Sequence, residues 1–303
     1  IQMTAETPIS VRKQTGRIGA EITGIDLRAT ISETDAAMLR TQQAQHQVIF
    51  FPGQHLDLQQ QKILTAVFGP ALQLPYVTPM ESDPQIIRVY KGADEKGGVF
   101  GGDWHSDFSF LELPPSGSVL NAHTLPPYGG DTLWASQGAA WDALPGALQD
   151  LLLGRDAIHV GKPYGVKWAP PVKEQSGAGI KMSRGDPTAD CERRHPAVLQ
   201  HPVTGRRMLY LNPTYVTRLG GMSEADSSPL LDQIQRHVTR PEFCVRYSWT
   251  PGTVAIWDNL ATLHYAVNDY QGHERLMYRT TFSGLSPREM AASPAKAARN
   301  AAE

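Results

Sequence analysis

Short apolar runs recur along the whole chain and are separated by turn-forming residues, a pattern that predicts many short strands. Alternating residues over 9–27 predict a strand and hairpin, and a second hairpin is predicted over 198–211 with its turn at Thr204-Gly205. Compact apolar runs, which are typical of strands, occupy 48–51, 86–90, 108–113, 118–124, 243–249, 253–257 and 279–282.

Helices are predicted where apolar residues recur at helical spacing after a capping residue. Ser32 is expected to cap a helix that ends near Gln45, with Asp35 in the third-position role, and Ser223 to cap a helix that reaches about His237. Further helices are predicted over 58–68, 137–144 and 145–153.

The order of these elements predicts the fold class. Many strands, few helices and no alternation of strand and helix favour a mainly β fold, a double sheet or barrel with flanking helices, over a parallel α/β fold. We expect one domain over 1–290. The irregular stretch 161–194 is expected to be a lid, a binding loop or disordered, and the alanine-rich residues 291–303 a frayed tail.

Composition narrows the class of protein. The 303 residues include 27 Gly and 23 Pro, which is turn-rich, and 28 basic against 30 acidic residues, which gives no nucleic-acid-binding surface. No apolar run is long enough to cross a bilayer and no signal peptide is visible, so we expect no membrane partner. The two cysteines are far apart, and a reduced, soluble, cytoplasmic protein is the simplest interpretation. We also expect a homo-oligomer.

The first candidate metal-binding residues lie in the segment Gly101-Gly102-Asp103-Trp104-His105-Ser106-Asp107. On an extended segment, residues two apart point to the same face, so His105 and Asp107 can converge on one ion. An imidazole and a carboxylate, joined by a second histidine, form the ligand set of a divalent transition metal. Taken alone, a His-x-Asp sequence is more often a pair of residues in a surface loop than a metal site.

His264 is the candidate second histidine, since it follows the run 254–257 and ligands gather at the ends of strands. A satisfied structural histidine is the alternative. Arg275 and Arg279 lie four apart in the last strand-like run and therefore share a face. Two guanidinium groups on an inward face need anionic partners, whereas on an outward face they would meet only solvent.

Together these motifs resemble the taurine and aryloxyalkanoate dioxygenases, which are non-haem iron enzymes that consume 2-oxoglutarate. The resemblance spans nearly all of 9–285, and its motifs occur in the family's order: Trp104-His105-Ser106-Asp107, Gly129-Gly130-Asp131-Thr132, Trp257-Asp258-Asn259 with His264, then Arg275 and Arg279. It also covers 16–22, 51–54 and 201–205.

The resemblance implies roles for these residues. His105, Asp107 and His264 would hold Fe(II), and Thr132 with Arg275 would bind the distal carboxylate of 2-oxoglutarate. The fold implied is a double-stranded β-helix, or jelly-roll barrel. The activity implied is hydroxylation of a small acidic substrate by dioxygen, with release of succinate and carbon dioxide.

The substrate is read from positions where the chain departs from the taurine enzymes. Leu74 and Val77 align with a His and a Tyr of those enzymes, and Gly101 aligns with an Asn. The resemblance implies that Arg279 pairs with the acid group, and apolar Leu74, Val77 and Phe108 then favour a hydrophobic acid.

An aryloxyalkanoate, cleaved to a phenol and a keto or aldehyde acid, is the expected substrate. An alkyl sulfonate or sulfate ester, including a taurine-like one, is the alternative. The same apolar residues are also compatible with a plain core. A jelly-roll isomerase and a metal-free ligand-binding jelly roll remain as competing classes, although neither requires the triad, Thr132 and Arg275 together.

Overall fold

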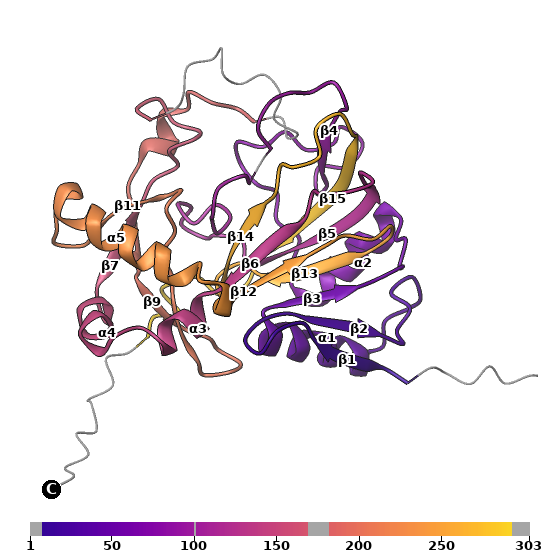
Figure 1. The fold of residues 1–303 in the computed structure, drawn as a ribbon, viewed down its shortest axis with the longest axis horizontal. Coiled ribbons are helices and arrows are strands. Elements are labelled where there is room, and N and C mark those ends of the chain that lie inside the picture. Colours follow the sequence, from indigo (N-terminus) through magenta and orange to yellow (C-terminus); the bar gives the residue numbers. More distant parts are fainter. Residues whose placement is uncertain (1–7, 100, 169–181, 293–303) are drawn as a thin grey trace, which may run out of the picture.

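The computed structural model describes residues 8–99, 101–168 and 182–292 (Figure 1). Its largest sheet has seven strands in the order β1-β2-β3-β13-β5-β15-β4. Every pairing in it is antiparallel except that of β2 with β3. The strands are β1 (Ser10–Lys13), β2 (Ala20–Thr23), β3 (Val48–Phe51), β13 (Val254–Asp258), β5 (Gly117–Thr124), β15 (Arg275–Phe282) and β4 (Ile87–Lys91).

A three-stranded sheet, ordered β12-β6-β14, packs against the inner face of the large sheet. Its strands are β12 (Cys244–Tyr247), β6 (Thr132–Ser136) and β14 (Thr262–Ala266). Buried side chains of both sheets meet between them, with the Trp134 ring 5.4 Å from Phe50 and 5.8 Å from Trp257, centroid to centroid. Two antiparallel sheets face to face around one core are the arrangement expected of a jelly roll.

Two helices, α1 (Glu33–His46) and α2 (Leu58–Phe68), cover the outer face of the large sheet. Ser32 accepts a hydrogen bond from the Asp35 backbone N–H, so the expected cap is confirmed, and Asp57 forms a capping box with Gln60. Apolar residues of both helices, Leu39 and Leu64 among them, are fully buried against the sheet. This layer shields the large sheet from water on the side away from the site.

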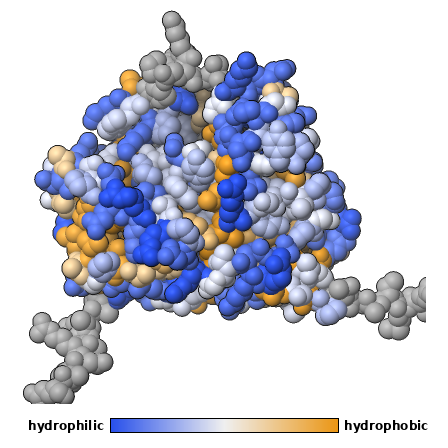
Figure 2. Space-filling model, in the orientation of Figure 1, coloured by the Kyte–Doolittle hydropathy of each residue, from blue (hydrophilic) through white to orange (hydrophobic). Residues whose placement is uncertain are grey.

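A second layer lies beyond the small sheet. It contains α3 (Gln137–Asp142), α4 (Gly146–Leu152) and α5 (Glu224–Val238), a sheet of β11 (Val216–Leu219), β7 (Asp156–His159) and β8 (Arg193–Pro196), and the hairpin β9 (Val198–Gln200) with β10 (Arg207–Leu209). Short 3-10 helices occupy Pro187–Asp190 and Pro241–Phe243. Apolar residues show at the surface where α4 and α5 lie (Figure 2), above partly buried Leu148, Leu230 and Leu231.

Three expectations need correction. Residues 108–113 form turns rather than a strand, because Phe108 adopts a left-handed conformation, with φ 48°, and its carbonyl accepts from the Leu111 N–H. His264 does not follow a strand end but lies within β14, which the apolar pattern did not single out. Ala291 and Ala292, expected in a frayed tail, are fixed, since Ala291 bridges to Leu199 and Ala292 is buried.

The stretch 161–194 is only partly irregular. It ends in a 3-10 helix and β8, while residues 169–181, the middle of the stretch 161–194 in which a lid was expected, lie outside the described residues. Residues 293–303 of the expected tail also lie outside them. Within the described parts of the chain, no helix combines the length and the apolar character that a membrane crossing needs.

Gly117 provides a test of how tightly the sheets are packed. A Cβ at this position would lie 2.2 Å from Phe282 Cζ and 2.5 Å from the Trp257 carbonyl oxygen, and the backbone atom cannot move aside. Gly117→Ala should therefore lower the free energy of unfolding by about 1–3 kcal/mol or more in urea denaturation, as overpacking does. Gly16→Ala is the matched control, since no atom lies within 4 Å of the added Cβ; equal stability of the two variants would contradict this packing.

Candidate active site

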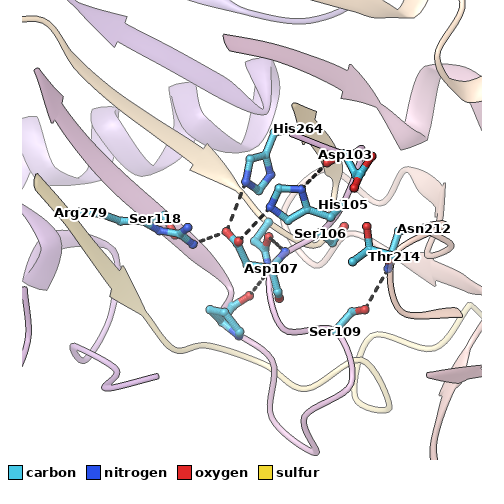
Figure 3. Close-up of polar contacts among 12 residues, drawn as sticks. Asp103, His105, Ser106, Asp107, Ser109, Ser118, Asn212, Thr214, His264 and Arg279 are labelled. Atoms are coloured by element: carbon cyan, nitrogen blue, oxygen red, sulfur yellow. Dashed lines mark hydrogen bonds and ion pairs between the residues drawn. The ribbon is translucent and has the colours of Figure 1, made fainter. Parts of the chain in front are cut away.

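Two histidines and one aspartate form a buried cluster where the 101–110 loop meets β14 (Figure 3). His264 comes from β14, and His105 extends that sheet by an isolated bridge. The His105 N–H donates to the His264 carbonyl at 3.1 Å, and the His264 N–H donates back at 2.8 Å. Two backbone hydrogen bonds therefore bring the histidines together.

Asp107 completes the cluster, and the candidate ligand atoms of the three residues all lie within 4.8 Å of one another. His105 Nε2 is 3.4 Å from Asp107 Oδ1, and His264 Nε2 is 3.6 Å from Asp107 Oδ2. The three side chains are 4%, 0% and 7% exposed, in the order His105, Asp107, His264. The expected convergence of these residues is thus present, with the donor set that a divalent transition metal takes.

The ionisation states of the cluster suit a metal. His105 Nδ1 lies 2.7 Å from the Asp103 carbonyl oxygen, which can only accept, so Nδ1 carries a proton and Nε2 is the ring nitrogen that faces Asp107. Burial lowers the pKa of His264 well below its ordinary value and keeps this imidazole neutral. His105 Nε2 and Asp107 Oδ1, 3.4 Å apart, are close enough to bind one cation together.

Arg279 keeps Asp107 ionised. Burial opposes the charge of the Asp107 carboxylate, but the Arg279 guanidinium holds the pKa of Asp107 well below its ordinary value. The Arg279 side chain donates to Asp107 Oδ2 and, at 3.0 Å, to Ser118 Oγ, and its guanidinium stands 5.5 Å over the Trp257 ring. In this structure the residue expected to meet the substrate's acid group is paired with Asp107.

Asn259 clamps the backbone of the aspartate. Its side-chain oxygen accepts from the Asp107 N–H at 2.7 Å, and its Nδ2 donates to the Asp107 carbonyl at 3.0 Å and to the Pro115 carbonyl at 2.8 Å. Asn259 is fully buried and lies in the turn between β13 and β14. One amide thus links the Asp107 loop to the turn that leads into the strand of His264.

Further hydrogen bonds fix the same loop on both sides of Asp107. Ser106 Oγ donates to the Thr262 carbonyl at 2.9 Å. Ser109 Oγ lies 2.9 Å from His159 Nδ1 and accepts from Asn212 Nδ2, also at 2.9 Å. These partners lie in β14, in β7 and in the loop before β11, so three separate parts of the chain hold the Asp107 loop.

Thr132 and Arg275, the residues expected to bind 2-oxoglutarate, are both buried. Thr132 Oγ1 accepts a hydrogen bond from Trp249 Nε1 at 3.0 Å. The Arg275 guanidinium interacts electrostatically with Asp131, the residue before Thr132. Arg275 Nε has no hydrogen-bond partner within the described ranges, and burial lowers the pKa of its guanidinium. A buried guanidinium with an unfilled donor fits a carboxylate ligand.

The Gly129-Gly130 turn gives Arg275 its space. Gly130 has φ 69°, and a Cβ there would lie 3.2 Å from Arg275 Nε. A small cavity of about 20 Å³ borders Arg275, and two of its lining residues, Val99 and Ala266, also line the main cavity. Arg275 therefore lies one layer of side chains away from the main cavity.

The main cavity has a volume of about 510 Å³ and reaches His105. Gly101, Tyr164, Tyr215 and Arg184 are among its lining residues. Gly101 has φ 79°, and a Cβ there would lie 3.0 Å from the His105 ring, so the backbone needs a glycine here for two reasons. The volume is that of a typical small-molecule pocket.

The remaining predicted residues lie in one apolar cluster. Leu74, Val77 and Phe108 are buried together with Phe110, Tyr164 and Tyr215. They do not line the main cavity themselves, whereas Tyr164 and Tyr215 belong to both the cluster and the cavity wall. These two tyrosines and Arg184 were not predicted from the sequence, in which the long irregular stretch around Tyr164 and Arg184 is the only signal of their role.

Asn259→Ala should weaken metal binding by about ten- to hundredfold, because removal of outer-shell support for a ligand typically has that effect. The measurement is calorimetric titration of the protein with Mn(II), beside the thermal midpoint of unfolding. Asn121→Ala is the matched control, since Asn121 is an equally buried amide that binds the Leu56 carbonyl at 3.0 Å, away from the cluster. Should both variants lose stability and affinity alike, Asn259 would have no specific role in holding Asp107.

Comparison with known proteins agrees with this geometry. The chain is 37% identical over 286 residues to the alpha-ketoglutarate-dependent sulfate ester dioxygenase of Pseudomonas putida, which covers 92% of this chain and 91% of the relative. It is 28% identical over 273 residues to the (S)-phenoxypropionate/alpha-ketoglutarate-dioxygenase of Sphingobium herbicidovorans, covering 88% of this chain and 92% of the relative.

A solved taurine dioxygenase from Burkholderia xenovorans matches the structure with a TM-score of 0.76 at 30% identity, over 92% of each chain, and confirms the jelly-roll fold. The model of the family described as taurine catabolism dioxygenase TauD, TfdA matches residues 10–281. The chain therefore belongs to the TauD, TfdA family and is an oxidoreductase that depends on Fe(II) and 2-oxoglutarate.

Proposed function

We propose that His105, Asp107 and His264 hold the Fe(II), and that the enzyme hydroxylates an alkyl sulfate ester at the carbon next to the ester oxygen. The observation that carries the proposal is the buried cluster, in which two imidazoles and a carboxylate converge beside a cavity of about 510 Å³. When bound, the iron supplies the activation of dioxygen, coupled to oxidative decarboxylation of 2-oxoglutarate to succinate.

The protein residues hold and orient what the iron needs. Asp103 and Asn259 fix the His105 ring and the Asp107 backbone before any ligand arrives. Thr132 and Arg275 bind the distal carboxylate of 2-oxoglutarate, in a place where burial removes competing water and strengthens the charge-assisted hydrogen bonds. The cluster, which is almost fully buried, keeps water from the reacting atoms.

Arg279 is proposed to attract the acid group of the substrate toward the metal, as the family resemblance implies. Its support here is position, since it is buried and in contact with Asp107. Leu74, Val77 and Phe108 shape the apolar wall behind the cavity through Tyr164 and Tyr215. Gly101 leaves the space in which the taurine enzymes carry a polar side chain.

A sulfate ester is chosen as the substrate because of sequence identity to known dioxygenases. The chain is 37% identical to the sulfate ester dioxygenase over the aligned residues, against 28% for the phenoxypropionate enzyme. Hydroxylation of the carbon next to the ester oxygen gives a hemiacetal ester that collapses to an aldehyde and sulfate, so the bond breaks without a hydrolytic step.

An aryloxyalkanoate, the substrate expected from the sequence, is the second candidate. The observation that favours it is the aromatic wall, in which the Tyr164 ring lies 5.4 Å from Phe108 and 6.5 Å from Tyr215, with both pairs stacked. Stacked aromatic side chains are a good surface for a phenyl ring. The same oxidation next to the ether oxygen would release a phenol.

Arg275→Ala should raise the 2-oxoglutarate concentration needed for half-maximal turnover by about ten- to hundredfold, because the distal carboxylate loses a charge-assisted partner. The measurement is succinate release at saturating substrate over a range of 2-oxoglutarate concentrations. Arg240→Ala is the control, as Arg240 is an exposed arginine that pairs with Glu242 at 2.8 Å and has no contact with Thr132 or Arg275 among the described residues. An unchanged 2-oxoglutarate requirement in Arg275→Ala would remove this residue from the cosubstrate site.

Turnover of matched substrates tests the proposed reaction. With hexyl sulfate, the wild-type protein should release succinate, hexanal and sulfate in equal amounts, and with 2-phenoxypropionate it should release less succinate at equal concentration. Asp107→Ala should abolish coupled turnover, because the carboxylate ligand is lost. Greater turnover of phenoxypropionate would make the second candidate the function, and coupled turnover by Asp107→Ala would refute the assigned metal site.

A further inference from the structure

The main cavity has a single arginine or lysine among its described lining residues, Arg184, and the structure gives it no counter-ion. Within the described part of the chain, Arg184 forms no ion pair and no hydrogen bond through its side chain; its one recorded interaction is electrostatic, with Tyr164. The side chain is half-buried. An unpaired guanidinium in a concave, partly apolar wall is a binding group for an anion.

The backbone holds Arg184 in place without a ligand. Met182 bridges to Val77, and the Ser183 N–H donates to the Tyr76 carbonyl at 2.8 Å. On the other side, the Asp186 N–H donates to the Tyr164 carbonyl at 3.0 Å. The backbone on both sides of Arg184 is thus held by hydrogen bonds beside the cavity. This lowers the entropic cost of immobilising the Arg184 side chain when it binds an anion.

The described residues that line the cavity beside Arg184 offer a hydroxyl donor and no carboxylate paired with the guanidinium. The hydroxyls of Tyr164 and Tyr215 are 3.4 Å apart, and one hydrogen bond between them leaves one hydroxyl proton free. Asp103 is the one acidic residue among the described lining residues; it is exposed, and no ion pair joins it to Arg184. The charge of Arg184 is therefore not neutralised by the wall.

Arg279 lies deeper and is already paired. It is 4% exposed, contacts Asp107 and Ser118, and is not among the residues that line the cavity. Both arginines act on the electrostatics of the Tyr164 hydroxyl, so this residue lies within the field of each. The active site thus has an inner cation at the metal cluster and an outer cation in the cavity wall.

We propose that Arg184 is a second anion-binding residue, and that the preferred substrate carries two acidic groups, with the outer one bound to Arg184. This inference rests on the proposed function, which places the inner acid group near Arg279. Between the two acid groups, the side chains of Val99, Met182 and Tyr265, which line the cavity, would contact a short aliphatic chain. The substrate class is an alkyl sulfate with a carboxylate or second sulfate at its far end.

Two probes of equal chain length test the proposal, hexyl sulfate and 6-sulfooxyhexanoate. Their affinities are measured by anaerobic calorimetry on the protein loaded with Fe(II) and 2-oxoglutarate, so that the result does not depend on turnover. The wild-type protein should bind the diacid about ten- to hundredfold more tightly, the range for a hydrogen bond to a charged group. Arg184→Gln should reduce this ratio to near one, while Arg184→Lys should keep part of it.

Arg194→Gln is the matched control, because Arg194 is an exposed arginine of β8 outside the cavity, and its affinity ratio should equal that of the wild type. Equal binding of the two probes by the wild type would overturn the inference. So would an unchanged ratio in Arg184→Gln, or equal losses for both probes, which would give Arg184 a structural role or a role on the inner acid group.

Succinate release separates the two levels of the argument. Turnover of hexyl sulfate without preference for the diacid would overturn the second anion site and leave the proposed reaction intact. Failure to bind or oxidise either probe would refute both. Altered affinity for 2-oxoglutarate in Arg184→Gln, with the probe ratio unchanged, would assign Arg184 to the cosubstrate and contradict the proposal.

Discussion

The charge of Asp107 is the constraint around which the site is built. A carboxylate taken fully out of water would be protonated unless positive charge and hydrogen-bond donors replaced its hydration. Arg279 supplies the charge from β15, and Asn259 secures the backbone from the β13–β14 turn. Each partner comes from a different part of the fold, so an ionised Asp107 requires β15 and the β13–β14 turn to be in place. Removal of Arg279 would leave a buried charge without compensation, which is far more costly than the absence of the whole pair.

The same logic explains how residues far apart in the chain meet with so little regular structure between them. His264 is placed by antiparallel pairing with Trp134 in β6, and His105 then pairs with His264 as if it were a fourth strand one residue long. Asp107 cannot extend this ladder, because Phe108 turns the chain into a left-handed conformation. The amide of Asn259 takes over from the sheet there, and a carboxylate is thereby held opposite two imidazoles.

Much of the scaffold could be predicted from the sequence, because α1, α2 and α5 carry their own caps and the central strands β3 and β13 carry nearly continuous apolar runs. The run 108–113 was wrongly predicted to be a strand for a physical reason. Its apolar side chains are buried by tertiary packing against Tyr164 and Tyr215, and the resulting apolar pattern in the sequence is the same as that of a buried strand. Strand β14, which contains His264, was missed because Thr262–Ala266 is a short segment in which polar and apolar residues are mixed. The cluster was predicted only through several motifs in order, and Arg184 was not predicted, since an unpaired arginine in an irregular stretch has no distinguishing local pattern.

The arginines of this site differ in what the protein already provides for them. Arg279 has a protein carboxylate, and its desolvation is compensated in the folded chain itself. Arg275 is equally buried but has no carboxylate partner within hydrogen-bond distance among the described residues, so part of its compensation must come from a ligand. Because a ligand that binds only the folded state adds RT ln(1 + [L]/Kd) to stability, a carboxylate at Arg275 would contribute to the fold as well as to catalysis. Arg275 and Arg184, which have no carboxylate partner among the described residues, are therefore the positions at which an acidic ligand would stabilise the folded protein most.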